Sequence, residues 1–356
     1  MFNPTPLAAT PLVSVILPVF NAGPYLSEAI ESILGQTLIS FELFIIDDCS
    51  DDDSLAVARR YESQDSRVTV LVNDYNRGRA HSDNRGHTLA RGRYIAKMDA
   101  DDVALPHRLQ TQFDFLESHP AIALTSSFLE TMGATRTVYT YPLKADEVLA
   151  FLLFNMPVGN PTVFFRRELI TQHQLHYDEQ IQDTFGEDYE WVARVARVAA
   201  IENQPSILLR YRTFPATHKA DVHARRTAKA SLIRARVLEQ AGFKASPREL
   251  HVHNTIAHYP FELGDITLAE AHAWLLNLAT QNKRLGYADS AALRLVLAER
   301  WFWTCYHNPD RTVDSSREFG RHELARDYIP TAALKLKFWL KNKVLRRLKS
   351  NLLCSF

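Results

Sequence analysis

The chain has 356 residues, enough for about two domains, and 46% of them are hydrophobic, which suffices for a sizeable core. Lys and Arg together number 41, as do Asp and Glu, so no net charge favours binding to nucleic acid. Three widely spaced cysteines, no secretory signal and no apolar run of about 20 residues exclude a disulfide-rich secreted protein and a membrane-spanning one. We therefore expect a cytoplasmic protein with reduced thiols.

The N-terminal part of the chain alternates between strand-like and helix-like segments. Apolar runs of strand length occur at residues 13–17, 41–46, 68–72, 94–98 and 122–125. Apolar residues at helical spacing indicate helices at residues 24–34, 51–64 and 105–118. This alternation predicts an α/β fold in which helices cover both faces of a mostly parallel sheet.

The turn after the first strand excludes one class of nucleotide-binding protein. A dinucleotide-binding fold would place a Gly-x-Gly-x-x-Gly motif there. The chain instead continues through Pro18-Val19-Phe20-Asn21-Ala22-Gly23. Phosphate groups must therefore be held in another way, and the chain after the fourth strand offers one.

Three carboxylates follow the fourth predicted strand, in the stretch Lys97-Met98-Asp99-Ala100-Asp101-Asp102. Ligands of open α/β sheets bind beyond the carboxyl ends of the strands. On extended backbone, Asp99 and Asp101 would share a face, and such a pair suits Mg²⁺ or Mn²⁺ held together with substrate phosphates. We interpret this stretch as the metal–diphosphate site of an enzyme that uses a nucleotide sugar. Taken alone, the cluster would equally fit a solvated acidic turn.

Several short segments match the pattern of one enzyme family. They lie at residues 15–21, 32–37, 42–50, 76–78, 92–95, 99–102 and 186–191, the last reading Gly186-Glu187-Asp188-Tyr189-Glu190-Trp191. Each segment is short, but their order and spacing are specific and extend over residues 13–213. The chain resembles a family 2 glycosyltransferase of the GT-A fold, a Rossmann-like α/β domain.

The resemblance implies an inverting enzyme that uses a UDP-sugar. Its nucleotide pocket would begin at the end of the first strand, at Pro18, Val19, Phe20 and Asn21, with Phe20 against the base. Asp48 would accept a hydrogen bond from the base N–H, which favours uracil, or would serve as a turn or helix-capping acid. Arg77 or Arg79 would meet the diphosphate or the base, or remain a solvated loop charge.

For the acidic stretch, the resemblance implies a role for each residue. Asp99 would lie near the donor sugar or the ribose, with Ala100 beside it in the donor site. Asp101 would be a ligand of Mn²⁺ or Mg²⁺, and Asp99 would complete the protein's share of the metal site. The cation would offset the charge that develops on the departing diphosphate.

Asp188 is the candidate general base. Apolar residues after it repeat at helical spacing, which puts Glu187 and Asp188 in the first turn of a helix, where the helix dipole favours ionised carboxylates. Such a carboxylate can take the proton of an acceptor hydroxyl while that oxygen attacks the anomeric carbon, and one displacement inverts the centre. The alternative is that both acids only stabilise the start of the helix.

The C-terminal third is predicted to be helical. We divide the chain into a lead-in (1–12), a GT-A domain (13–218), a helical domain (219–307), a polar linker (308–330) and a basic amphipathic helix (331–356). The last segment holds seven basic and no acidic residues. Its apolar positions share one helical face: Leu334, Phe338, Leu345, Leu348 and Leu352.

Such a helix lies naturally on an anionic membrane surface. It favours peripheral attachment at the inner face of the membrane and a glycan or lipid-linked acceptor, as in bacterial surface polysaccharide or lipopolysaccharide synthesis. The alternative is a helix that packs on the protein or on another subunit. Two other functions also stay open at this point: a different nucleotide-sugar enzyme such as a nucleotidyltransferase, and a non-catalytic glycan- or membrane-binding module.

Overall fold

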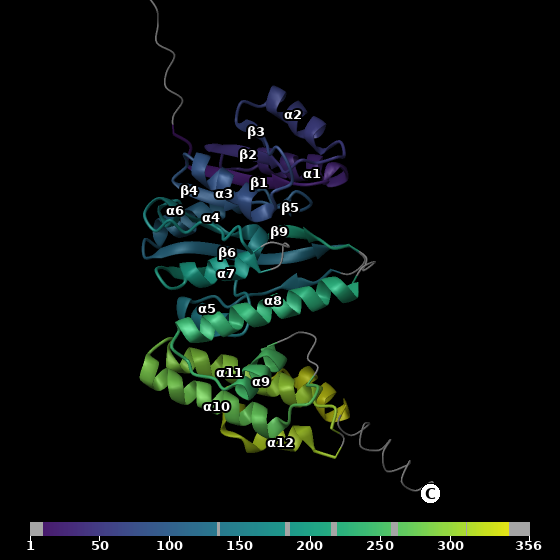
Figure 1. Ribbon diagram of the computed structural model, residues 1–356, viewed down its shortest axis with the longest axis vertical. Helices are drawn as coiled ribbons and strands as arrows, with labels where there is room; N and C mark the ends of the chain where they lie inside the picture. The colour runs from purple at the N-terminus through teal and green to yellow at the C-terminus, as the bar shows by residue number, and fades with distance from the viewer. Residues whose placement is uncertain are drawn as a thin grey trace, which may run out of the picture. The chain divides into compact units, whose positions relative to one another are not determined.

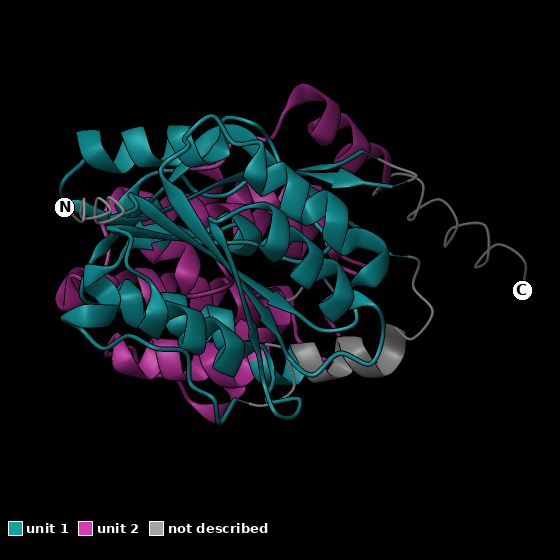
Figure 2. Cartoon of the chain, turned by 90° about the horizontal axis from the view of Figure 1, so that it is seen from above, with its two compact units in different colours: residues 1–148, 157–229 teal, residues 149–156, 230–356 magenta. Residues whose placement is uncertain are grey.

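The computed structural model describes residues 10–133, 136–181, 186–214, 219–257, 263–310 and 312–341, with backbone alone for 219–226 (Figure 1). Most of the predicted lead-in and residues 342–356 of the predicted basic helix therefore lie outside the described residues. The chain forms two compact units, residues 1–148 with 157–229, and residues 149–156 with 230–356 (Figure 2). Residues 149–156 belong to the second unit because the ring of Phe154 stacks on that of His253, with ring centroids 4.7 Å apart.

The first unit is built on one mixed sheet, which has nine strands among the described residues. Four neighbouring strands are parallel, in the order β3 (Val68–Val72), β2 (Phe41–Asp47), β1 (Val13–Val19) and β4 (Tyr94–Lys97). The sheet continues from β4 through β8 (Phe164–Arg166), β6 (Ile122–Met132), β9 (Ala200–Arg212) and β5 (Val103–Ala104), while β7 (Val138–Tyr139) pairs with β6. The predicted strands of the N-terminal part are thus present.

The sheet departs from the prediction where it leaves the parallel core. β8 is antiparallel to both β4 and β6, so the sheet is mixed. The long strand β9, which is not among the strands predicted above, pairs in parallel with β6. β5 follows the acidic turn and pairs with the C-terminal end of β9. This pairing brings β9 next to the acidic turn.

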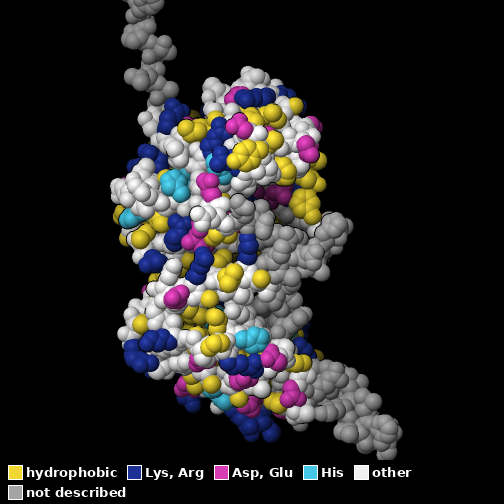
Figure 3. Space-filling model, viewed as in Figure 1, with side chains coloured by type: hydrophobic (Ala, Val, Ile, Leu, Met, Phe, Trp, Pro, Cys, Tyr) yellow, Lys and Arg dark blue, Asp and Glu magenta, His cyan; other side chains and the backbone are white. Residues whose placement is uncertain are grey.

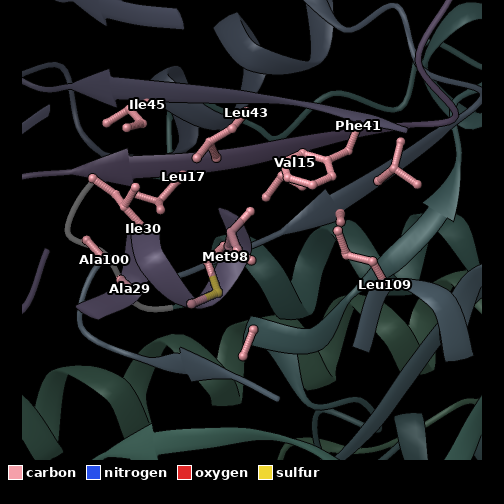
Figure 4. Packing of buried hydrophobic residues seen from close by; sticks show 14 of the residues in the cluster. Val15, Leu17, Ala29, Ile30, Phe41, Leu43, Ile45, Met98, Ala100 and Leu109 are labelled. Carbon is pink, nitrogen blue, oxygen red and sulfur yellow. The ribbon is translucent and has the colours of Figure 1, made fainter. Parts of the chain in front are cut away.

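Helices cover both faces of the parallel strands. Those of the first unit are α1 (Gly23–Leu34), α2 (Ser54–Gln64), α3 (Arg79–Leu89), α4 (Arg108–Ser118), α5 (Ala145–Leu152), α6 (Glu168–Thr171) and α7 (Glu187–Val195), with α5 ending in the second unit. Val15 and Leu17 of β1 pack with Ile30 of α1 in the core (Figure 4). Ile16 points to the other face, where a Cβ on Gly86 of α3 would come within 2.5 Å of it. A glycine is therefore needed for α3 to lie close to β1.

The second unit is helical, as predicted. Its elements are the end of α8 (Lys219–Gln240), α9 (Pro247–Ala257), α10 (Leu268–Leu285), α11 (Ser290–His307), α12 (Ser315–Arg321) and the 3-10 turn η2 (Glu323–Arg326). α10 begins with a capping box between Thr267 and Glu270. No helix among the described residues is both long and apolar enough to cross a bilayer.

The segment expected to be a polar linker, residues 308–330, contains α12, η2 and the buried Leu324. The Asp314 side chain accepts a hydrogen bond from Arg317 N and caps α12, and Phe319 then packs against Phe302. Residues 332–341 are helical, and Phe338 is buried against the same Phe302 ring. The start of the predicted basic helix thus contributes to the core of the second unit.

Candidate functional site

A pocket of about 370 Å³ lies in the first unit, beyond the carboxyl ends of β1, β2 and β4. It is lined by nine of the ten residues expected to hold the donor: Pro18, Val19, Phe20, Asn21, Asp48, Arg79, Asp99, Ala100 and Asp101. The tenth, Arg77, does not line it, because its guanidinium lies 5.3 Å over the exposed ring of Tyr75. Parallel strands that end at one edge of the sheet bring these distant segments together.

Asp48 organises one wall of the pocket. It is buried, and its Oδ1 accepts hydrogen bonds from Asn73 Nδ2 (2.7 Å) and from the backbone N–H of Arg77 (2.9 Å). Its Oδ2 accepts from the backbone N–H of Gly78 (2.8 Å), where φ is 84°. Asp48 therefore shapes the turn that leads into α3, and Oδ2 retains a lone pair for a further donor.

The turn after β1 is tied to the turn after β2. Asn21 has a φ of 50°, and its side-chain oxygen accepts from the backbone N–H of Asp51 (3.0 Å). Ser50 Oγ accepts in turn from the backbone N–H of Asn21 (3.1 Å). Phe20, just before this turn, lines the pocket and is 52% exposed. An exposed aromatic ring next to a turn held by hydrogen bonds suits contact with a flat ligand.

The three carboxylates after β4 lie on a turn. β4 ends at Lys97, one residue earlier than predicted, so Asp99 and Asp101 do not share the face of an extended strand. Asp102 is fully buried; one oxygen accepts from Arg212 N (2.8 Å), and Oδ2 has no hydrogen-bond partner among the described residues. Burial, followed by the charge of Asp99, raises the pKa of Asp102 to about 8 and also raises the pKa of Asp101. A positive ligand group would relieve this crowding.

Arg79 brings a positive charge into the acidic turn. Its guanidinium forms an ion pair with Asp99, and its Nε lies 3.8 Å from Asp83 Oδ2. Burial lowers the pKa of Arg79, but the surrounding carboxylates, led by Asp99 and Asp83, raise it well above its usual value. Behind it, the buried Lys97 places Nζ 3.2 Å from Asp83 Oδ2 and 3.1 Å from the Tyr177 hydroxyl.

Glu187 and Asp188 occupy the first turn of α7, as predicted, directly after Gly186 at φ 117°. Neither lines the pocket, but both are among the carboxylates that raise the pKa of Arg79. Glu187 is buried, and its Oε2 has no hydrogen-bond partner in the described part of the chain. Burial, followed by the charge of Asp188, raises its pKa. The two acids are thus within electrostatic reach of the same guanidinium as Asp99.

Several site residues are missing from the sequence-based prediction. Tyr25 and Phe214 form an aromatic pair at the pocket, with ring centroids 5.3 Å apart, and the Arg212 guanidinium lies 4.6 Å over Tyr25. Asp83 and Lys97 were also not assigned a role. The only available signal for Lys97 was a charge in an otherwise apolar strand. Among the described residues, no group of three or more His, Cys, Asp or Glu side chains could hold a metal ion.

Comparison with known proteins supports the sequence resemblance. Residues 14–173 match the model of the family described as "Glycosyl transferase family 2". An "Uncharacterized glycosyltransferase" of Haemophilus influenzae is 32% identical over 213 residues, which cover 57% of this chain and 65% of that protein. MJ1057 of Methanocaldococcus jannaschii, also named a glycosyltransferase, is 31% identical over 209 residues, covering 57% of this chain and 71% of that protein. TuaG of Bacillus subtilis, provisionally named a teichuronic acid biosynthesis glycosyltransferase, is 34% identical over 168 residues, covering 46% and 66%.

Two solved structures share the fold. S. aureus TarS 1–349 in complex with UDP-GlcNAc superposes with a TM-score of 0.55 at 16% identity, covering 83% of this chain and 88% of that one. The mannosyltransferase PcManGT from Pyrobaculum calidifontis, in complex with GDP-Man and Mn²⁺, gives a TM-score of 0.50 at 20% identity, with coverages of 82% and 81%. The GT-A fold predicted from the sequence is confirmed.

Proposed function

The chain belongs to glycosyltransferase family 2 and is a glycosyltransferase, and from this premise we propose that it transfers a sugar, with inversion, from a UDP-sugar to a hydroxyl of a glycan or lipid-linked acceptor. The observation that carries the proposal is the convergence of nine expected donor-binding residues on one pocket of about 370 Å³. Family membership favours glycosyl transfer over the two alternatives, a nucleotidyltransferase and a non-catalytic module.

The nucleotide would lie between Phe20 and Asp48. Phe20 offers an exposed ring for the base, and Asp48 Oδ2 keeps a lone pair for a base N–H. The guanidinium of Arg79 lines the same pocket and suits a diphosphate. The uracil preference is part of the proposal, and the two structural neighbours, one with UDP-GlcNAc and one with GDP-Man, show that both base types occur within this fold.

Asp101 and Asp99 would hold Mn²⁺ or Mg²⁺ together with the donor's phosphates. The crowded carboxylates and the unpartnered Asp102 Oδ2 fit a cation, and because no complete ligand group exists among the described residues, phosphate oxygens and water would supply the rest. When bound, the cation would stabilise the negative charge of the leaving diphosphate.

Asp188 would act as the general base and Glu187 would support it. A carboxylate in the first turn of α7 can take the proton of the acceptor hydroxyl. The hydroxyl oxygen then bonds to the anomeric carbon as the bond to the diphosphate breaks. A single displacement of this kind inverts the sugar centre, so an α-linked donor gives a β-linked product.

The second unit would bring the enzyme to an anionic membrane at its inner face, where a surface polysaccharide or lipopolysaccharide grows on lipid. Support comes from the basic segment 331–356 and from the exposed Leu336, Trp339 and Leu340. Because Phe338 is buried in the second unit, truncation after Lys341 is a cleaner test than truncation at Pro330. We expect full-length protein to float with anionic liposomes and the truncated chain to bind less; equal flotation would contradict membrane attachment by residues 342–356.

The direct test of the function is a screen of UDP- and GDP-sugars with Mn²⁺. We expect one UDP-sugar to raise the unfolding temperature and to be hydrolysed slowly without acceptor. With an acceptor glycan, NMR of the product should show the inverted anomer. A retained anomer would contradict the displacement by Asp188, and a thermal shift with GDP-sugars alone would contradict the uracil assignment.

A further inference from the structure

The acidic turn that we assign to a divalent cation already has a counter-ion. Arg79, the first residue of α3, lines the pocket and forms an ion pair with Asp99. The carboxylates of Asp83, Glu187 and Asp188 add to the negative potential around it. A guanidinium cannot lose its charge in a protein, so the positive charge beside Asp99 persists at all working pH values.

Asp83 and Lys97 explain why Arg79 pairs with Asp99. Asp83 lies one helical turn further along α3 and would be the natural (i, i+4) partner. The Nζ of Lys97 is 3.2 Å from Asp83 Oδ2, whereas Arg79 Nε is 3.8 Å away, so Lys97 takes the closer place. The four charges therefore alternate in sign, in the order Lys97, Asp83, Arg79 and Asp99. Because Lys97 is the closer partner of Asp83, the guanidinium of Arg79 pairs with Asp99. Both Lys97 and Asp83 are buried, which holds this order in place.

We propose that Arg79 keeps divalent cations out of the free site and releases Asp99 when a nucleoside diphosphate enters. A cation at Asp99 would stand against the guanidinium, and this repulsion opposes binding of the cation alone. A diphosphate offers the guanidinium a bidentate partner, so Arg79 moves to it and Asp99 becomes free. Cation and nucleoside diphosphate then bind cooperatively, and each raises the affinity for the other by the same factor. This inference rests on the proposed nucleotide-sugar function.

The test measures Mn²⁺ binding directly, by the EPR signal of free Mn²⁺, in the full chain with and without saturating UDP or GDP. For the wild type we expect Mn²⁺ to bind at least about 10-fold more tightly when the nucleotide is present, within the usual range of coupling between sites. Arg79→Met should raise the affinity of the free protein for Mn²⁺ by about 5-fold or more and reduce the coupling correspondingly. The same variant should bind UDP less tightly in the absence of Mn²⁺.

Arg59→Met is the matched control, since Arg59 pairs with Glu62 on α2 and does not line the pocket. Arg79→Gln keeps an N–H donor for Asp99 without the charge, should shift Mn²⁺ affinity in the same direction, and keeps the test decisive if Arg79→Met does not fold. Unchanged or weaker Mn²⁺ binding by the folded Arg79 variants would overturn the inference while leaving the proposed function intact. A wild type that binds neither nucleotide, with or without Mn²⁺, would overturn both.

Discussion

A buried histidine of the second unit and two buried acids of the first unit differ in how their polar atoms are paired. In the second unit, His253 is buried with both ring nitrogens paired, to Leu153 O (2.9 Å) and to Trp274 Nε1 (3.1 Å). In the first unit, Glu187 and Asp102 are buried, and each has one carboxylate oxygen without a hydrogen-bond partner among the described residues. Leaving such an oxygen unpaired costs stability, by roughly 1–3 kcal/mol for a polar group.

This difference separates a structural use of polarity from a functional one. A paired histidine fixes one packing of the second unit's core. The two acids with an unpaired oxygen in the first unit instead lie within electrostatic reach of Arg79, which lines the pocket. Unsatisfied buried acids that perturb one another's pKa are typical of binding and catalytic sites. Surface charge makes no such distinction, because Lys and Arg are interspersed with Asp and Glu on the face seen in Figure 3.

The largest effect is expected at the proposed base. Asp188→Asn keeps the shape of the side chain and removes its ability to take a proton, so kcat should fall about 10²- to 10⁴-fold while the protein stays folded. Initial rates of sugar transfer measure this. Asp146→Asn, which changes an exposed acid in the first turn of α5, is the control and should retain full activity. Full activity in Asp188→Asn would mean that another group, Glu187 first, takes the proton.

Breaking the buried ion pair between Lys97 and Asp83 should change the free energy of unfolding by nearly as much as Asp188→Asn changes the activation free energy. Lys97→Met leaves Asp83 charged and buried without its closest partner, so the free energy of unfolding should fall by about 3–5 kcal/mol. The double variant Asp83→Leu with Lys97→Met removes both charges and should recover most of that loss. Urea unfolding of wild type, both single variants and the double variant measures the coupling. Additive losses would show that the two charges do not depend on each other.

Two glycines, one in each unit, should respond to alanine with opposite sign. A Cβ on Gly86 would come within 2.5 Å of Ile16, so Gly86→Ala should destabilise the protein by about 1–3 kcal/mol. A Cβ on Gly320 of α12 meets nothing within 4 Å, so Gly320→Ala should stabilise it by up to about 1 kcal/mol through helix propensity. Thermal unfolding of both variants is the measurement. Equal effects would contradict the close approach of α3 to β1.

The smallest effect is a pH dependence from His253. Since an indole N–H only donates, Nδ1 must accept from Trp274, and the ring is held neutral with its proton on Nε2. Burial lowers the pKa of His253 to about 3, against about 6.5 in the unfolded chain. The unfolded state thus binds more protons below pH 6.5, and stability falls as the pH falls.

Between pH 7.0 and 5.5 this histidine should remove about 1 kcal/mol from the free energy of unfolding. The amide of His253→Gln can replace both hydrogen bonds. The free energy of unfolding of this variant should therefore fall by that much less than that of the wild type over the same pH range. Urea unfolding at the two pH values provides the comparison. An identical loss in wild type and variant would show that His253 is not the titrating group.

The strands of the first unit were predictable because each is a run of apolar residues short enough to read locally. β1, β2 and β3 lie where the pattern places them, and so does the first turn of α7 with Glu187 and Asp188. α3 was missed for a physical reason. Its buried face consists of Ala80, Ser82, Asp83, Gly86 and His87, so it shows no apolar period. Its burial depends on a close approach to β1 that only a glycine allows.

From the sequence alone, the segments that carry the chemistry could be identified, because acids, prolines and glycines at strand ends are local signals. The partners of those residues came only from the tertiary structure. Arg79 pairs with Asp99, and Phe214 with Tyr25, across long separations that no spacing rule encodes. Arg77 and Arg79 look alike in the sequence, yet one lies over an exposed tyrosine and the other in the pocket. The direction of a side chain depends on the turn that Asp48 holds, which forms only after β2 and the start of α3 meet.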